Sequence, residues 1–106
     1  MKVLFDQGTP APLRKALIGH EVETAFERGW STLQNGQLIA AAEAAGFEVF
    51  VTTDQSLKYQ QSLAARTIAI VVLLTTSWPR IERQLPRVVK AVDESAPAGH
   101  TEVQIE

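Results

Sequence analysis

The longest uninterrupted apolar stretch of the chain runs from Ile68 to Leu74 and is entirely aliphatic. A strand that is apolar on both sides of its pleat needs cover on both faces, which is typical of an inner strand of a parallel sheet. The stretch is also far too short to cross a bilayer, so we expect no membrane span. It therefore predicts a central strand at residues 66–73 of a layered α/β domain.

Other short apolar runs alternate with segments of helical character. We expect strands at residues 2–5, 20–23, 47–51, 66–73 and 101–105, and helices at residues 10–17, 36–45, 57–64 and 78–92. Thr9 and Pro10 suit the start of the first helix, and Pro86 should kink or split the last. Strands that alternate with helices predict a largely parallel sheet of about five strands. With 106 residues, the chain is expected to be a single domain, residues 1–106.

Composition excludes several classes of function. The net charge of −2 and the pI near 5.7 give no global basic field that would attract nucleic acid. The absence of cysteine rules out disulfides, thiolate catalysis and cysteine-based zinc sites, and it fits a reducing cytoplasm. The chain passes from Met1 and Lys2 directly into a strand, so we expect no signal peptide and a cytoplasmic location.

Two aspartates follow apolar strand-like runs and are the main candidates for chemistry. Asp6 comes directly after Val3-Leu4-Phe5, and Asp54 follows the strand expected at residues 47–51. In an open parallel sheet such positions converge on one crevice, where α/β folds place ligands. Two carboxylates there would attract a hard cation such as Mg²⁺ or Mn²⁺. The simpler interpretation is that each is a helix cap or a turn residue.

Asn35 is a third candidate, because it begins a helix that leads into the third strand and could lie on the same rim. Its amide could position a metal-bound water, although a plain N-cap is an equally good interpretation. Trp30 and Trp78 could each stack on a base or pack on the core.

Four cations recur at spacings of three, four and three along the last expected helix: Arg80, Arg83, Arg87 and Lys90. Such a stripe can follow a phosphate backbone, which makes these residues candidates for RNA binding. More often it is the solvated face of an amphipathic helix.

Taken together, these segments resemble the compact PIN-like proteins, small bacterial relatives of the PIN nucleases that are often toxins of type II toxin–antitoxin pairs. The resemblance covers nearly the whole chain. It rests on Lys2-Val3-Leu4-Phe5-Asp6-Gln7-Gly8, Gly19-His20-Glu21-Val22, the Asn35 helix and Val51-Thr52-Thr53-Asp54-Gln55-Ser56-Leu57, in the family's order and spacing.

The resemblance implies a three-layer α/β/α fold and a Mg²⁺- or Mn²⁺-dependent endoribonuclease that cuts single-stranded RNA. Asp6 matches the family's first acid and Asp54 the acid after the third strand. Both would hold metal, while Asn35 would position water. The resemblance also implies an antitoxin protein as partner and a homodimer.

The chain departs from the family's pattern at three positions. Asn35 stands where an aspartate is usual, and Ser56 and Leu57 stand where the pattern reads Asp and Phe. These departures favour an alternative, a catalytically degenerate module that binds a partner protein or RNA. A third class, a phospho-receiver, would need paired acids near the first strand and a lysine after the fifth. Asp6 stands alone at the first strand, which argues against it.

Overall fold

The structure, a computed structural model, describes residues 1–55 and 67–105, apart from the side chain of Asn35. The helix expected at residues 57–64 lies outside these residues, as do Ser56 and Leu57. No helix within the described ranges is long and apolar enough to cross a membrane.

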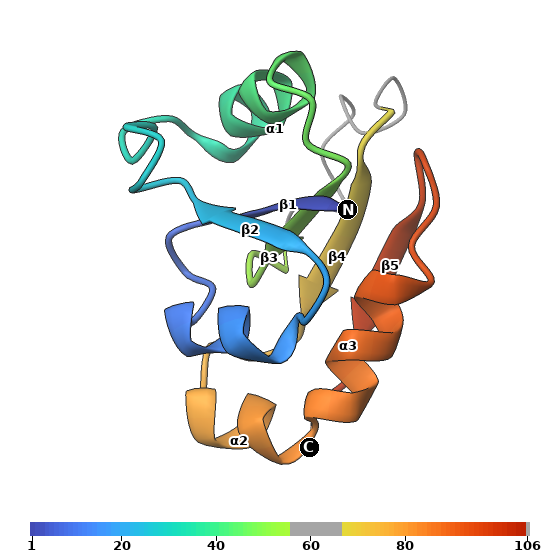
Figure 1. Ribbon diagram of the computed structural model, residues 1–106. Helices are drawn as coiled ribbons and strands as arrows, with labels where there is room; N and C mark the ends of the chain where they lie inside the picture. The colour runs from blue at the N-terminus through green and yellow to red at the C-terminus, as the bar shows by residue number, and fades with distance from the viewer. Residues whose placement is uncertain (56–66, 106) are drawn as a thin grey trace.

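Five parallel strands form one sheet in the order β2-β1-β3-β4-β5 (Figure 1). The strands are β1 (Lys2–Phe5), β2 (Glu21–Thr24), β3 (Val49–Thr52), β4 (Ala69–Leu73) and β5 (His100–Val103). The aliphatic run supplies β4, an inner strand whose five residues are all buried. The expected α/β fold with a parallel sheet is therefore confirmed.

Helices cover both faces of the sheet, which gives three layers (Figure 1). Helix α1 (Asn35–Ala44) covers one face, where Leu38, Ile39 and Ala42 pack against Leu4 and Phe50. The other face carries the short 3₁₀ helix η1 (Ala11–Ala16), α2 (Trp78–Arg83) and α3 (Leu85–Asp93). On that face the core is built from side chains of alternate strand positions, such as Val3 and Phe5, together with residues of these helices.

Several helix boundaries differ from the expectations. Pro86 does split the last helix, since α2 ends at Arg83 and α3 begins at Leu85. The first helix is a single 3₁₀ segment whose N-cap is Pro10, so the cap expected at Thr9 is wrong. Helix α1 has Gln34 as its N-cap, with the Gln34 N–H donating to Gln37 Oε1 at 3.2 Å. Asn35 is therefore the first helical residue and not the cap.

The strand order creates a reversal between β1 and β3. From β1 the chain moves outward to β2, whereas from β3 it moves to β4 on the opposite side. At such a switch point the connections leave the sheet in opposite directions and open a crevice at the carboxyl ends of the strands. The segments that begin with Asp6 and Thr53 leave the sheet at this point.

Candidate functional site

The Asp6 carboxylate lies at the end of β1 and is only 8% exposed. Its Oδ1 atom accepts hydrogen bonds from the Thr9 N–H at 3.0 Å and from the Thr9 hydroxyl at 2.6 Å. Its Oδ2 atom accepts one from the hydroxyl of Thr52, which is fully buried at the end of β3. An ionised carboxylate offers about four lone-pair sites, so these three bonds leave room for one more partner.

Thr52 connects the two aspartates that the sequence singles out. Its Oγ1 atom donates to Asp6 and accepts from the backbone N–H of Asp54 at 3.0 Å. The Asp6 N–H donates to Val51 O at 3.2 Å, so the ends of β1 and β3 remain in register. Asp6 and Asp54 therefore follow neighbouring strands, as the sequence predicts. The Thr52 hydroxyl that bonds to both residues was not expected.

The two loops also touch at Gly8. A Cβ atom at this position would lie 2.5 Å from Thr53 Oγ1 and 3.9 Å from Asp6 Oδ1. The first distance is far below van der Waals contact, so a side chain at residue 8 would require the Thr53 hydroxyl or the turn after Asp6 to move.

A cleft of about 880 Å³ opens beside Asp6. Its aromatic lining consists of Phe26 and Trp78, and its polar lining includes hydroxyl and amide groups from three segments of the chain. The polar residues are Asp6, Gln7, Thr9, Thr24, Ser31 and Thr76. Asp54 is not among the described residues that line it. The cleft thus joins one buried carboxylate to an aromatic and hydroxyl-rich surface.

The turn that follows β2 forms one wall of this cleft and is held by several hydrogen bonds. The Thr24 N–H donates to Glu27 Oε1 at 2.9 Å, and the Glu27 N–H donates to the Thr24 hydroxyl at 3.1 Å. Arg14 of η1 donates to both carboxylate oxygens of Glu27. The hydrogen bond from Arg14 and that from the Thr24 backbone hold the pKa of Glu27 below its ordinary value. The charged form of Glu27 therefore fastens this turn to η1 at neutral pH.

Whether the site fits a divalent cation depends on the oxygen atoms that could ligate the ion. Within residues 1–55 and 67–105, no three histidine or carboxylate side chains come together as a ligand set. Mg²⁺ commonly needs only one or two carboxylates, because it keeps several waters and uses phosphate oxygens of the substrate. The remaining lone-pair site of Asp6, with Asp54 on the adjoining loop, fits that kind of weakly held ion.

The other predicted site residues lie in different surroundings. Asn35 begins α1, but its side chain lies outside the described part of the structure. Arg80 and Arg83 are exposed on α2, while Arg87 and Lys90 are exposed on α3. The expected single stripe is thus divided between two helices.

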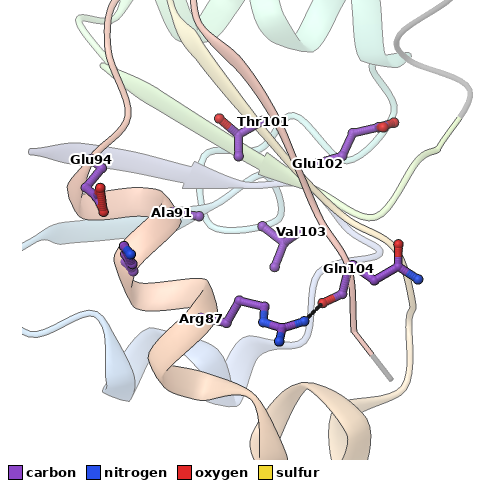
Figure 2. Close-up of a pocket in the computed structure, with 8 residues that line it drawn as sticks. Arg87, Ala91, Glu94, Thr101, Glu102, Val103 and Gln104 are labelled. Carbon is purple, nitrogen blue, oxygen red and sulfur yellow. Dashed lines mark hydrogen bonds between the residues drawn. The ribbon is translucent and has the colours of Figure 1, made fainter.

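Arg87 and Lys90 line a groove between α3 and β5 (Figure 2). Figure 2 shows Arg87, whose Nη1 atom donates to Gln104 O at 2.8 Å. Glu94 and Glu102 line the same groove, so its charge is mixed. This groove and the cleft at Asp6 have no lining residue in common. The described lining of the cleft contains no Lys or Arg.

Of the two tryptophans, Trp30 packs on the core. Its ring meets that of Phe47 edge-on, with centroids 6.2 Å apart, and the Arg28 guanidinium lies 4.7 Å from its centroid. Trp78 is half-buried at the start of α2 and lines the cleft. Both rings thus contact the core. Trp78 also borders the cleft, and Trp30 also lines a smaller pocket that includes Asp6.

Sequence reasoning missed the hydrogen bonds that two threonines make to the Asp6 carboxylate. Thr9 donates to this carboxylate and does not cap a helix, and the position of Thr52 at a strand end does not show which neighbour its hydroxyl bonds. Phe26 was overlooked as well. A signal existed, because Phe26 is directly followed by two charged residues, Glu27 and Arg28, and belongs to no apolar repeat.

Comparison of the chain with protein-family models, with curated proteins and with solved structures gives no match.

Proposed function

We propose that the cleft beside Asp6 is the active site of a metal-dependent endoribonuclease, the toxin of a toxin–antitoxin pair. The observation that carries the proposal is that Asp6 and Asp54 follow neighbouring strands at the reversal between β1 and β3, where the Asp6 carboxylate and the Asp54 backbone N–H both bond to the Thr52 hydroxyl. Ligands of open α/β sheets bind at such reversals.

Each residue would have a defined part in hydrolysis of an RNA phosphodiester. Asp6 would hold a Mg²⁺ or Mn²⁺ ion through its remaining lone-pair site, with Thr9 and Thr52 fixing the direction of the carboxylate. Asp54 would contribute the second carboxylate, and Asn35 would orient water. When bound, the ion supplies Lewis-acid stabilisation of the charge on the phosphodiester. Arg80 and Arg83, exposed on the helix that begins at Trp78, would neutralise flanking phosphates.

Cleavage of end-labelled single-stranded RNA in Mg²⁺ and in Mn²⁺ tests the proposal. Wild type should cut, while Asp6→Asn and Asp54→Asn should each lose at least about 100-fold of the rate, because each loses a charge that holds the ion. At position 6, Asn keeps the size of Asp and an acceptor oxygen for Thr9 or Thr52. At position 54 the bond to Thr52 is made by the backbone N–H, which the substitution leaves in place, so both variants should fold.

Asp93→Asn is the matched control, since Asp93 is an exposed aspartate on α3 that pairs with His20 at 2.6 Å. It should cut like wild type. Equal cutting by wild type and Asp6→Asn would contradict the assignment of the active site.

A second candidate is a catalytically degenerate module that binds a partner protein, such as an antitoxin, or RNA. The three protein hydrogen bonds already made to the Asp6 carboxylate favour it, because they let this carboxylate hold the two loops together without an ion. This candidate predicts no cleavage with either ion by folded wild-type protein. It also predicts a stable complex on co-expression with the product of a neighbouring gene, and recovery of the uncomplexed chain would count against it. A homodimer remains a prediction that sedimentation would check.

A further inference from the structure

Phe26 is 77% exposed and borders the cleft at Asp6. A single exposed apolar side chain is ordinary on a protein surface. Ile18, which is 88% exposed, is such a case and is not among the described residues that line the cleft. Phe26 differs because its ring stands at the rim of a cleft that already contains a second aromatic, Trp78.

The backbone that presents Phe26 is held on both sides. Ala25, the preceding residue, is buried, and its N–H donates to Phe5 O at 2.9 Å at the end of β1. The Gly29 N–H donates to Phe26 O at 3.0 Å, and the Trp30 N–H donates to Ala25 O at 2.9 Å. The reciprocal bonds between Thr24 and Glu27 close the same turn. A ligand that covers the ring would therefore incur little cost for ordering the backbone.

The remaining lining selects the kind of ligand. Around the two aromatics lie the side chains of Thr24, Ser31 and Thr76, together with the amide of Gln7. The Thr24 hydroxyl already accepts from the Glu27 N–H, and the Gln7 amide already donates to Ser31 O. An apolar peptide anchor would cover the hydroxyls of Ser31 and Thr76 without offering them a hydrogen-bond partner, which is unfavourable. An unpaired nucleobase has a flat face that stacks on aromatic rings and an edge that hydrogen-bonds to hydroxyl and amide groups.

We propose that Phe26 and Trp78 form a stacking subsite for an unpaired nucleobase of a single-stranded nucleic acid. The inference rests on the proposed function only in placing nucleic acid in the same cleft, and it needs neither cleavage nor metal. It makes Phe26 a specificity-determining residue, because a base inside a duplex cannot offer its face to the ring.

The test measures binding without catalysis. Fluorescently labelled ten-nucleotide oligouridylate and oligoadenylate are titrated with protein at low ionic strength in EDTA, and anisotropy gives the dissociation constant. Phe26→Ala should weaken binding about tenfold or more, which is the scale of one lost base–aromatic stack. Phe26→Tyr should restore most of the affinity, and Ile18→Ala should bind like wild type. Trp78 fluorescence, read in a Trp30→Phe background, should be quenched by the oligonucleotide.

Four results would overturn the inference. The first three are an affinity of Phe26→Ala equal to that of wild type, an equal loss of affinity in Ile18→Ala, and no binding of either oligonucleotide by wild type. The fourth is that an unlabelled duplex of the same sequence competes for the protein as well as the unlabelled single strand does. The outcome is separable from that of the cleavage assay. Loss of binding in Phe26→Ala without any cleavage by wild type would support the subsite and reject the nuclease. Cleavage by wild type and Phe26→Ala at equal rates would support the nuclease and reject the subsite.

Discussion

Thr52 is the residue on which the geometry of the candidate site most depends. Its single hydroxyl donates to Asp6 and accepts from the Asp54 N–H, so one oxygen atom joins the ends of β1 and β3. The side chain is fully buried, and water cannot replace the hydroxyl without opening the core. A Thr at the end of an otherwise apolar strand thus acts as a connector between two loops.

Thr52→Val should lower the free energy of unfolding by about 1–3 kcal/mol, because it keeps the shape of Thr but leaves a buried carboxylate oxygen and a backbone N–H without their partner. Urea denaturation followed by circular dichroism measures the change. Thr52→Ser should recover most of the loss. Thr101→Val, at an exposed position of β5, is the control and should stay within about 0.5 kcal/mol of wild type. A Thr52→Val protein as stable as wild type would show that the hydroxyl has no structural part.

At the scale of elements, the loops after β1 and β3 fit together through one missing side chain. Gly8→Ala should destabilise the protein by about 1–3 kcal/mol, because the new Cβ would collide with Thr53 Oγ1. Thr53→Ala removes that oxygen, so the double variant Gly8→Ala/Thr53→Ala should recover most of the loss in urea denaturation. Gly36→Ala is the control, since a Cβ there has nothing within 4 Å. A double variant no better than the sum of its singles would contradict the proposed contact.

Elements that depend on strong local patterns were predictable from the sequence. The aliphatic run gave β4 because seven apolar side chains in succession need cover on both faces, and Pro86 divided α2 from α3 because its ring cannot continue a helix. The start of α1 was misjudged by one residue, since Asn is the better N-cap by residue type but Gln34 takes the position, where its N–H donates to Gln37 Oε1. The convergence of Asp6 and Asp54 followed from strand ends alone. Their connection through Thr52 did not, because it depends on which hydroxyl faces which carboxylate.

At the scale of the whole molecule, the sheet separates two cores that share only its backbone. Ile39 on α1 and Ile81 on α2 are both fully buried, on opposite faces. Ile39→Val and Ile81→Val should each cost about 0.5–1.5 kcal/mol. The double variant should equal their sum within about 0.5 kcal/mol, because the sites share no partner.

The urea dependence should retain one cooperative transition and an unchanged slope in all three variants. Two separate transitions would show that the layers unfold independently. A large departure from additivity would show that the sheet transmits strain from one face to the other.

The position of β1 between β2 and β3 has a consequence for the order in which a growing chain can assemble. On the ribosome, β1 and β2 emerge early, but the other neighbour of β1 is made only after α1. Until then the Asp6 carboxylate has Thr9 beside it but lacks Thr52. The candidate site is therefore among the later parts of the molecule to form. A nascent chain that stops before β3 contains Asp6 but not the Thr52 hydroxyl that bonds to its carboxylate.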